Sequence, residues 1–181
     1  MLTIGHSNRS IDAFIALLKA HGVTHLVDVR TVPRSRHNPQ FNADELPATL
    51  QAAGIAHTSM KALGGLRKPR PDSANRAWRN DSFRGYADYM QTPEFAEALD
   101  ALIALEQRGE RVAMMCAEAV PWRCHRSLIA DALLARGVPV AHIMSEQAAR
   151  PHALTSFAHV EGTRVTYPAA DLFDTGDAPT G

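Results

Sequence analysis

The residues most able to do chemistry in this chain are gathered in the segment CAEAVPWRCHR, residues 116–126. It contains both cysteines of the chain, together with a carboxylate, a histidine and two arginines. A cysteine between a strand end and a helix N-terminus tends to have a lowered thiol pKa, because the helix dipole and nearby arginines favour the thiolate. We therefore predict Cys116 as a nucleophile and Cys124 as a supporting residue, since a side chain entering a helix points less freely. Arg123 and Arg126 are predicted to bind an anionic substrate.

Other interpretations of this segment stay open. A free cysteine is most often a small, buried, apolar residue. Alternatively, the two cysteines and His125 could ligate zinc or iron, and Glu118 or His6 could complete such a site. The spacing Cys-x7-Cys-His is not that of a recognised zinc finger, and the neighbouring arginines disfavour a cation, so we predict no metal ligand and leave the cofactor open. Glu118 and His125 are instead predicted to take part in catalysis by moving or orienting protons.

Polar side chains that could join this site occur in three further segments, GHSNR at 5–9, DVRTVPRSR at 28–36 and LGGLR at 63–67. His6 could serve there as a general acid or base, or could cap the following helix. Asp28 and Arg30 alternate along a strand and therefore point to the same face, where the aspartate would orient the arginine. A structural buried ion pair is the alternative for these two residues. The residues predicted here to bind an anion are Asn8, Arg9, Arg30, Arg36 and Arg67.

The elements that must position these segments alternate between strands and helices. Apolar runs predict strands at 2–5, 23–30, 55–60, 111–117 and 138–144. Helical periodicity, capping residues and terminal glycines predict helices at 10–22, 42–54, 83–90, 92–109 and 124–137. Such alternation is typical of the α/β class, here a single three-layer domain with a mostly parallel central sheet and helices on both faces. Ligands bind beyond the carboxyl ends of parallel strands, so we expect the four polar segments to meet on one rim.

Length and composition indicate an ordinary globular protein. A chain of 181 residues with 45% apolar and 21% charged residues fits one domain, which we place at 1–165, followed by an acidic tail at 166–181 that we expect to be frayed. No apolar run approaches the roughly 20 residues of a membrane span, and MLTIGHSNRS does not resemble a signal peptide. With only two cysteines, one of them beside a histidine, we expect a cytoplasmic protein without membrane partners.

The formal net charge of zero conceals a basic region. Between Arg30 and Arg84 the chain has ten basic and four acidic residues, so this window carries +6 (10 − 4) and the remainder carries −6. Within it, residues 61–84 form a long loop in which arginines alternate with aromatic residues, a pattern that suits nucleotides or single-stranded nucleic acid. A solvated surface is the alternative interpretation.

Two resemblances follow from these segments. A strand ending in cysteine, an arginine-bearing loop and a helix is similar in plan to the active-site half of rhodaneses, and VDVR is similar to their aspartate–arginine strand, although the loop here lacks glycine. The blocks IGHSNR, VDVRTVPRSR, LGGLR, RGYADYM, CAEAVPWRCHR and AHI, in this order between about residues 2 and 145, resemble the domain-of-unknown-function family 488. That resemblance implies an α/β domain of bacteria and archaea, with motif positions on the same rim residues and no defined reaction.

From these observations we expect an enzyme that acts on a phosphate-bearing substrate, a nucleotide or nucleic acid, at the Arg/Cys/His-lined rim. A non-catalytic nucleotide-binding or nucleic-acid-binding module is one alternative, and a Cys/His redox or metal site is the other. The oligomeric state is left open by the sequence.

Overall fold

A computed structural model of the protein describes residues 1–169. Its strands are β1 Leu2–Gly5, β2 His25–Asp28, β3 Ala56–Ser59, β4 Val112–Cys116, β5 Ala141–Ile143, β6 Arg150–Pro151, β7 His159–Glu161 and β8 Arg164–Thr166. Its α-helices are α1 Ile11–Ala20, α2 Leu46–Ala52, α3 Asp81–Tyr89, α4 Pro93–Gln107 and α5 Arg126–Ala135. Short 3-10 helices occur at η1 Pro39–Phe41, η2 Lys61–Leu63 and η3 Pro121–Arg123.

The central sheet contains six strands in the order β3-β2-β4-β1-β5-β6. The first five strands of the chain pair in parallel, and the edge strand β6 pairs antiparallel with β5. All five predicted strands and all five predicted helices are present, so the expectation of a mostly parallel α/β sheet is confirmed.

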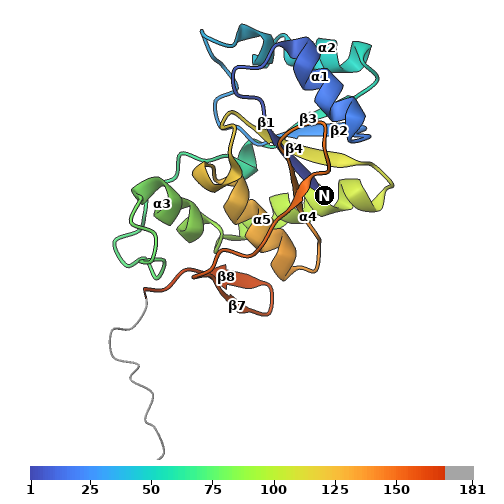
Figure 1. Ribbon diagram of the computed structural model, residues 1–181. Helices are drawn as coiled ribbons and strands as arrows, with labels where there is room; N and C mark the ends of the chain where they lie inside the picture. Colours follow the sequence, from blue (N-terminus) through green and yellow to red (C-terminus); the bar gives the residue numbers. More distant parts are fainter. Residues whose placement is uncertain (170–181) are drawn as a thin grey trace, which may run out of the picture.

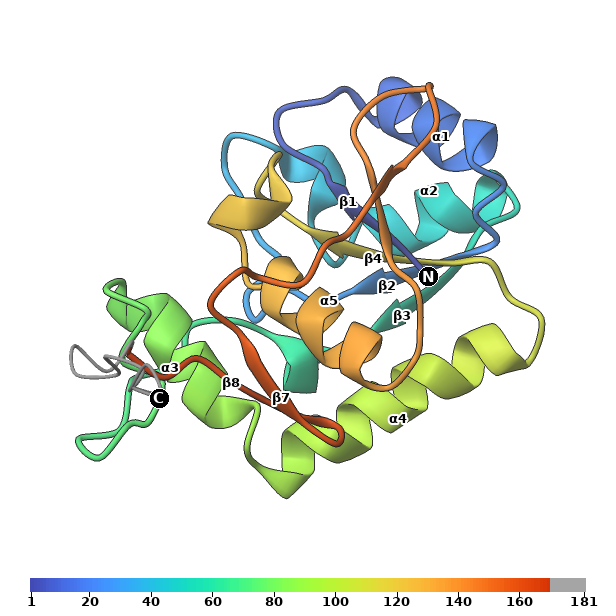
Figure 2. The ribbon, with the colours of Figure 1, turned by 60° about the horizontal axis from the view of Figure 1, so that its bottom comes forward.

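Helices cover both faces of this sheet, with α1 and α2 on one side and α3, α4 and α5 on the other (Figures 1 and 2). The side-chain alternation of the strands explains this layering. Leu26 and Met115 belong to the core under α1 and α2, whereas their neighbours Val27 and Met114 belong to the core that includes α4 and α5. The predicted three-layer arrangement is therefore confirmed.

Two helices begin at the residues that the sequence predicts. The Ser10 hydroxyl accepts a hydrogen bond from the Ala13 N–H at 3.2 Å, and the Thr92 hydroxyl accepts one from the Phe95 N–H at 3.3 Å. Pro93 occupies the first position of α4, where its missing N–H leaves no bond unmade. These caps fix where the chain turns from each preceding loop into its helix.

Three short strands near the end of the described chain lie outside the sequence prediction. β6 extends the main sheet, while β7 and β8 form a separate hairpin beside α5 (Figure 2). Tyr167 follows this hairpin and is fully buried, so Thr166 and Tyr167, assigned from the sequence to the tail, belong to the packed structure. Residues 170–181, the rest of that predicted tail, lie outside the described residues. Among residues 1–169, no helix is long and apolar enough to cross a membrane.

Candidate functional site

Three of the four polar segments, GHSNR, DVRTVPRSR and CAEAVPWRCHR, meet where the topology of the sheet favours ligand binding. The fourth, LGGLR, lies instead beside His125. β1 and β4 are neighbours in the sheet, and the helices that follow them, α1 and α5, leave to opposite faces, which opens a crevice beyond the strand ends. The His6 N–H continues the strand pairing by donating to the Cys116 carbonyl at 2.9 Å. A Cβ atom on Gly5 would lie 1.8 Å from the Glu118 carbonyl oxygen, so this close crossing of two loops requires glycine.

Two adjoining hollows open at this rim. The first, termed the rim cleft, has a volume of about 460 Å³ and is lined by His6, Ser7, Asn8, Arg30, Val32, Arg34, Ser35, Asn38, Ala117, Glu118 and Ala119. The second, termed the arginine hollow, has a volume of about 650 Å³ and is lined by Val32, Arg34, Ser35, Arg36, Pro39 and Asn42. Because the two share Val32, Arg34 and Ser35, they form neighbouring parts of one surface.

Three predicted residues line these hollows with accessible side chains. Asn8 and Glu118 are exposed in the rim cleft, and Arg36 is exposed in the arginine hollow. Ser7, between His6 and Asn8, has a φ of +52°, in the left-handed region that non-glycine residues rarely adopt. Backbone strain of this kind persists where the surrounding structure enforces it, and it is concentrated at functional sites.

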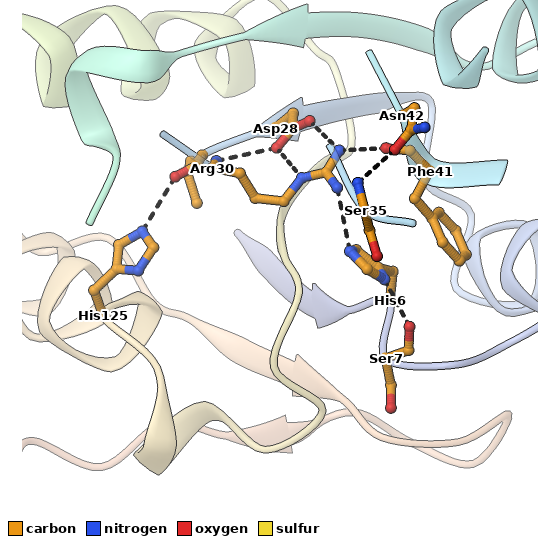
Figure 3. A network of polar contacts seen from close by, with 9 residues as sticks. His6, Ser7, Asp28, Arg30, Ser35, Phe41, Asn42 and His125 are labelled. Atoms are coloured by element: carbon orange, nitrogen blue, oxygen red, sulfur yellow. Dashed lines mark hydrogen bonds and ion pairs between the residues drawn. The ribbon is translucent and has the colours of Figure 1, made fainter. Parts of the chain in front are cut away.

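His6 forms one wall of the rim cleft as a buried, hydrogen-bonded ring (Figure 3). Its Nδ1–H donates to the Ser7 carbonyl at 2.8 Å, which leaves Nε2 to accept from Arg30 Nη1 at 3.2 Å. The imidazole also stacks on Phe41, with 4.3 Å between ring centroids. Burial lowers the pKa of His6 to about 4, so the ring is neutral at pH 7. Since both ring nitrogens are engaged, His6 holds the wall in place in this conformation.

Arg30 is held by Asp28, as the alternation along the strand predicts (Figure 3). Its Nε donates to Asp28 Oδ1 at 2.9 Å, and its Nη2 donates to Asp28 Oδ2 at 2.6 Å and to the Phe41 carbonyl at 2.7 Å. Arg30 is 6% exposed and Asp28 is 2% exposed. This geometry favours the structural ion pair over the predicted anion-binding role of Arg30.

The remaining predicted arginines of the exposed loops lie away from both hollows. Arg9 donates to the Gly5 carbonyl and, at 3.4 Å, to the Met144 carbonyl, and so links the ends of β1 and β5. The Arg67 guanidinium lies 3.6 Å over the ring of Tyr89 in α3. Arg123 is exposed in η3 and lines neither hollow. The structure therefore does not bring these three arginines together with the residues of the rim cleft.

Cys116, Cys124 and His125 form a buried cluster on the side of the sheet that α5 covers. His125 Nδ1 lies 4.0 Å from the Cys116 sulfur and 3.8 Å from the Cys124 sulfur. Its Nε2 lies 3.2 Å from the Val29 carbonyl oxygen, which can only accept (Figure 3). In the tautomer that makes this hydrogen bond, Nδ1 carries no proton and faces both sulfurs. The cysteines are 8% and 3% exposed and do not line the rim cleft.

The two thiols have opposite electrostatic environments. A hydrogen bond with Cys116, together with the Arg126 guanidinium, lowers the pKa of Cys124 despite its burial. The same hydrogen bond with Cys124, together with burial, raises the pKa of Cys116. These environments favour Cys124 over Cys116 as the thiolate, which is the reverse of the order predicted from the sequence.

Arg126, predicted to bind an anion, is 1% exposed and donates within the protein. Its Nε donates to Cys124 Sγ at 3.4 Å, its Nη1 donates to Thr3 Oγ1 at 3.1 Å, and its Nη2 donates to the Glu118 carbonyl. Among residues 1–169, no carboxylate forms an ion pair with Arg126. The sulfur of Cys124 is therefore the group in direct contact with Arg126 that can carry a negative charge.

A chain of buried side chains continues from Thr3, a contact of Arg126, towards the β7–β8 hairpin. Thr3 Oγ1 lies 2.8 Å from His142 Nδ1, and His142 Nε2 lies 2.9 Å from His152 Nδ1. His152 Nε2 lies 2.8 Å from Asp131 Oδ1, and the Tyr167 hydroxyl donates to Asp131 Oδ2 at 2.7 Å. Burial lowers the pKa of His142 to about 4. Since Asp131 accepts at one end, His152 can donate to Asp131 and accept from His142, and His142 can accept from Thr3.

The basic loop that follows β3 uses many of its side chains internally. Arg70 pairs with Asp72 at 2.9 Å, and Arg84 pairs with Asp81 at 2.6 Å. Trp78, the best candidate for stacking on a base, packs against other aromatic rings and the core. These contacts favour the interpretation of this loop as a solvated surface over that of a nucleic-acid surface.

Sequence reasoning missed several residues of the hollows, among them Arg34, Asn38 and Asn42, and most of the buried polar chain. Arg34 lines both hollows and stands two residues before Arg36, so the VPRSR segment contained the signal. His142 lies in β5, within the block AHI, and His152 directly follows β6. Neither position indicates a partner for the imidazole. Their partnership with Asp131 depends on tertiary packing, for which the sequence offers no local sign.

Comparison with known proteins identifies a family for most of the chain. The family model described as "Domain of unknown function DUF488" matches residues 10–133. Searches of the curated proteins and of the solved structures find no match to the chain. The matched residues include α1 through most of α5, the Cys/His cluster and the residues that line both hollows, apart from His6, Ser7 and Asn8.

Proposed function

We propose that this chain, which belongs to the DUF488 family, is an enzyme that acts on a phosphate-bearing substrate, a nucleotide or nucleic acid, at the rim cleft. The observation that carries this proposal is the adjacency of the two hollows at the crevice between β1 and β4. One hollow offers an exposed carboxylate and strained polar backbone, and the other offers two arginines. A substrate could thus place its anionic group in the arginine hollow and its reacting group in the rim cleft.

The arginines of this surface are available and held on an ordered loop. Arg34 and Arg36 are exposed, and neither forms an ion pair within the described chain. Between them, the Ser35 N–H donates to Asn42 Oδ1 at 2.7 Å, and the Ser35 hydroxyl accepts from the Asn38 N–H at 3.1 Å. A planar guanidinium on such a fixed loop is well suited to bidentate contact with phosphate oxygens.

Glu118 is the group we assign to proton transfer. Its backbone carbonyl accepts from Arg126 Nη2, which fixes the start of the loop after β4, while its side chain remains exposed in the rim cleft. A carboxylate held at this position can accept a proton from, or return one to, a bound substrate. His6 and Arg30 act as positioning residues, because their side chains are bonded to each other and to the surrounding backbone.

Calorimetric titration with pyrophosphate, adenosine monophosphate and a short single-stranded oligonucleotide tests the anion site. We expect the double variant Arg34→Ala/Arg36→Ala to bind these probes at least about tenfold more weakly, since each charge-assisted contact contributes about 1.5–3 kcal/mol. Arg70→Ala is the matched control, because Arg70 is an exposed arginine outside both hollows. Equal affinity of the double variant and the wild type would overturn the anion site.

Catalysis is tested separately, by mass spectrometry of the same nucleotide and oligonucleotide after incubation with the protein. We expect Glu118→Gln to keep the affinity for the probes and to lose about 10²–10⁴-fold in turnover, the usual contribution of a general acid or base. Unchanged turnover in this variant would remove Glu118 from the mechanism. Tight binding without conversion of any probe would instead support the non-catalytic binding module.

A further inference from the structure

The cluster on the α5 side of the sheet has the donor set of a metal centre. We propose that Cys116, Cys124 and His125 bind a zinc-class divalent ion through two sulfurs and the Nδ1 atom of the imidazole. Their three donor atoms all lie within 4.8 Å of one another. This site is separate from the residues that the proposed function uses, since none of the three lines either hollow.

The distances within the cluster are close to those of a bound zinc ion. Tetrahedral zinc with bonds of about 2.3 Å to sulfur and about 2.05 Å to nitrogen places those two atoms about 3.5 Å apart. The two sulfurs here lie 4.0 Å and 3.8 Å from His125 Nδ1. Side-chain movements of a few tenths of an ångström would therefore bring both sulfur–nitrogen distances to those around a bound zinc ion.

The orientation of His125 supports the same assignment. Its Nε2–H donates to the Val29 carbonyl, which can only accept, so the unprotonated Nδ1 faces the sulfurs. Metal-bound histidines usually donate their second ring N–H to a carbonyl or carboxylate in this manner, which fixes the tautomer and the ring. The aromatic ring of Tyr86, 5.0 Å from the imidazole between centroids, holds the other side of His125.

Space beside the donor nitrogen is preserved by a glycine. A Cβ atom on Gly65 would lie 3.1 Å from His125 Nδ1, closer than ordinary van der Waals contact. Any side chain there would crowd the position that an ion must occupy. The glycine of the loop LGGLR therefore leaves free space next to Nδ1, the atom of His125 that faces the sulfurs.

The charges around the cluster also fit a divalent ion, although an arginine lies beside it. Two thiolates neutralise the two charges of the ion, and Arg126 Nε, which donates to Cys124 Sγ, leaves one positive charge in the buried centre. With three protein ligands, the ion would retain one coordination position, the arrangement found in catalytic zinc sites. The residual charge favours an anion, such as hydroxide, as the fourth ligand.

Metal analysis of the full chain, purified under reducing conditions, tests this proposal. We expect one equivalent of zinc, and after removal with a chelator we expect cobalt(II) to restore one equivalent with the thiolate-to-cobalt charge-transfer absorption of a sulfur-ligated tetrahedral site. Cys116→Ser, Cys124→Ser and His125→Gln should each lower metal affinity by at least about tenfold, since changes to groups around a metal ligand alone cost that much. His37→Gln is the matched control, because His37 is exposed and remote from the cluster in sequence.

A second measurement keeps the proposal testable if a variant fails to fold. Zinc added to the reduced, metal-free wild type should protect both cysteines from alkylation by iodoacetamide. Substoichiometric zinc and cobalt binding by folded wild-type protein, with no protection of the thiols, would overturn the metal centre. Arg34→Ala/Arg36→Ala should retain the full equivalent of metal, so failure of the metal centre and failure of the anion site are distinguishable.

Discussion

Arg30 and Arg126 are two buried guanidinium groups at the same end of the sheet, and the protein neutralises them in different ways. Arg30 contacts the Asp28 carboxylate through two hydrogen bonds and is neutral as a pair. Arg126 contacts a sulfur, a hydroxyl and a carbonyl, and Asp131 is reached only through Thr3 and two histidines. Both side chains are more than nine-tenths buried, so each requires compensation for the loss of water.

This difference assigns a structural role to Arg30 and a chemical role to Arg126. A guanidinium paired with a carboxylate has little attraction left for another anion, so Arg30 stabilises the wall of the rim cleft. Arg126 instead donates a hydrogen bond from its positively charged guanidinium to Cys124 Sγ and thereby favours the thiolate form of Cys124. An ionised sulfur beside a second thiol and an imidazole is a reactive or metal-binding group, which an ion pair is not.

The largest effect is expected from breaking the Asp28–Arg30 pair. Asp28→Ala leaves a buried guanidinium without its carboxylate, which should lower the free energy of unfolding by about 3–5 kcal/mol. Urea denaturation followed by circular dichroism measures this loss. Asp72→Ala is the control, since its pair with Arg70 is fully exposed and should contribute little to stability. A loss for Asp28→Ala as small as that of the control would mean that Arg30 finds other compensation.

A smaller effect is expected when the second guanidinium is removed. Arg126→Met should lower the free energy of unfolding by about 1–3 kcal/mol, because the Glu118 carbonyl loses its donor while Thr3 keeps His142 and the Cys124 sulfur can take up a proton. The same denaturation experiment applies. If this variant were less stable than Asp28→Ala, Arg126 would contribute more to stability than the Asp28–Arg30 pair. That result would contradict the structural role assigned to Arg30 alone.

The smallest effect is expected from mild acid, which can protonate His6, a contact of Arg30, and His142, which is linked to Arg126 through Thr3. Burial lowers the pKa values of His6 and His142 to about 4, whereas in the unfolded chain both titrate near 6.5. The unfolded chain therefore binds protons first, so stability is complete above pH 6.5 and is lost as the pH falls towards 4. Between pH 6.5 and 5.5 we expect a loss of up to about 1 kcal/mol per histidine.

Urea denaturation across this pH range checks the direction and isolates each contribution. His142→Gln should remove the share of His142 and leave those of His6 and of His57, whose pKa is also lowered by burial. Stability that stays constant or rises from pH 6.5 to 5.5 would show that neither imidazole is held in its neutral form.

Local sequence signals were sufficient for most of the fold. Apolar runs, the caps Ser10 and Thr92 and the terminal glycines indicated each of the first five strands and all five helices. The strands β6, β7 and β8 are two or three residues long, too short for a periodic pattern, and their pairing depends on contacts with the finished sheet. The sequence therefore could not indicate that Tyr167 packs in the core.

The candidate site was predictable in its location and less so in its roles. Parallel topology brings strand ends together, which is why GHSNR, DVRTVPRSR and CAEAVPWRCHR meet as expected. Burial decides the roles, and the sequence does not show it. Asp28, two residues from Arg30, suggested the ion pair, whereas nothing near Arg126 suggested contacts with Thr3 or a connection to His142. The choice of Cys124 over Cys116 as the thiolate depends on those contacts.

The account centres on the claim that the Cys124 sulfur is the direct counter-charge of Arg126. A double-mutant cycle with Cys124→Ser and Arg126→Met, on reduced and chelator-treated protein, measures that interaction in the free energy of unfolding. We predict a coupling of about 1.5–3 kcal/mol, the range for hydrogen bonds to charged groups, and a smaller coupling in the parallel cycle with Asp131→Asn. A Cys124–Arg126 coupling below about 0.5 kcal/mol, or a larger one with Asp131, would contradict the claim and assign the counter-charge to the buried carboxylate instead.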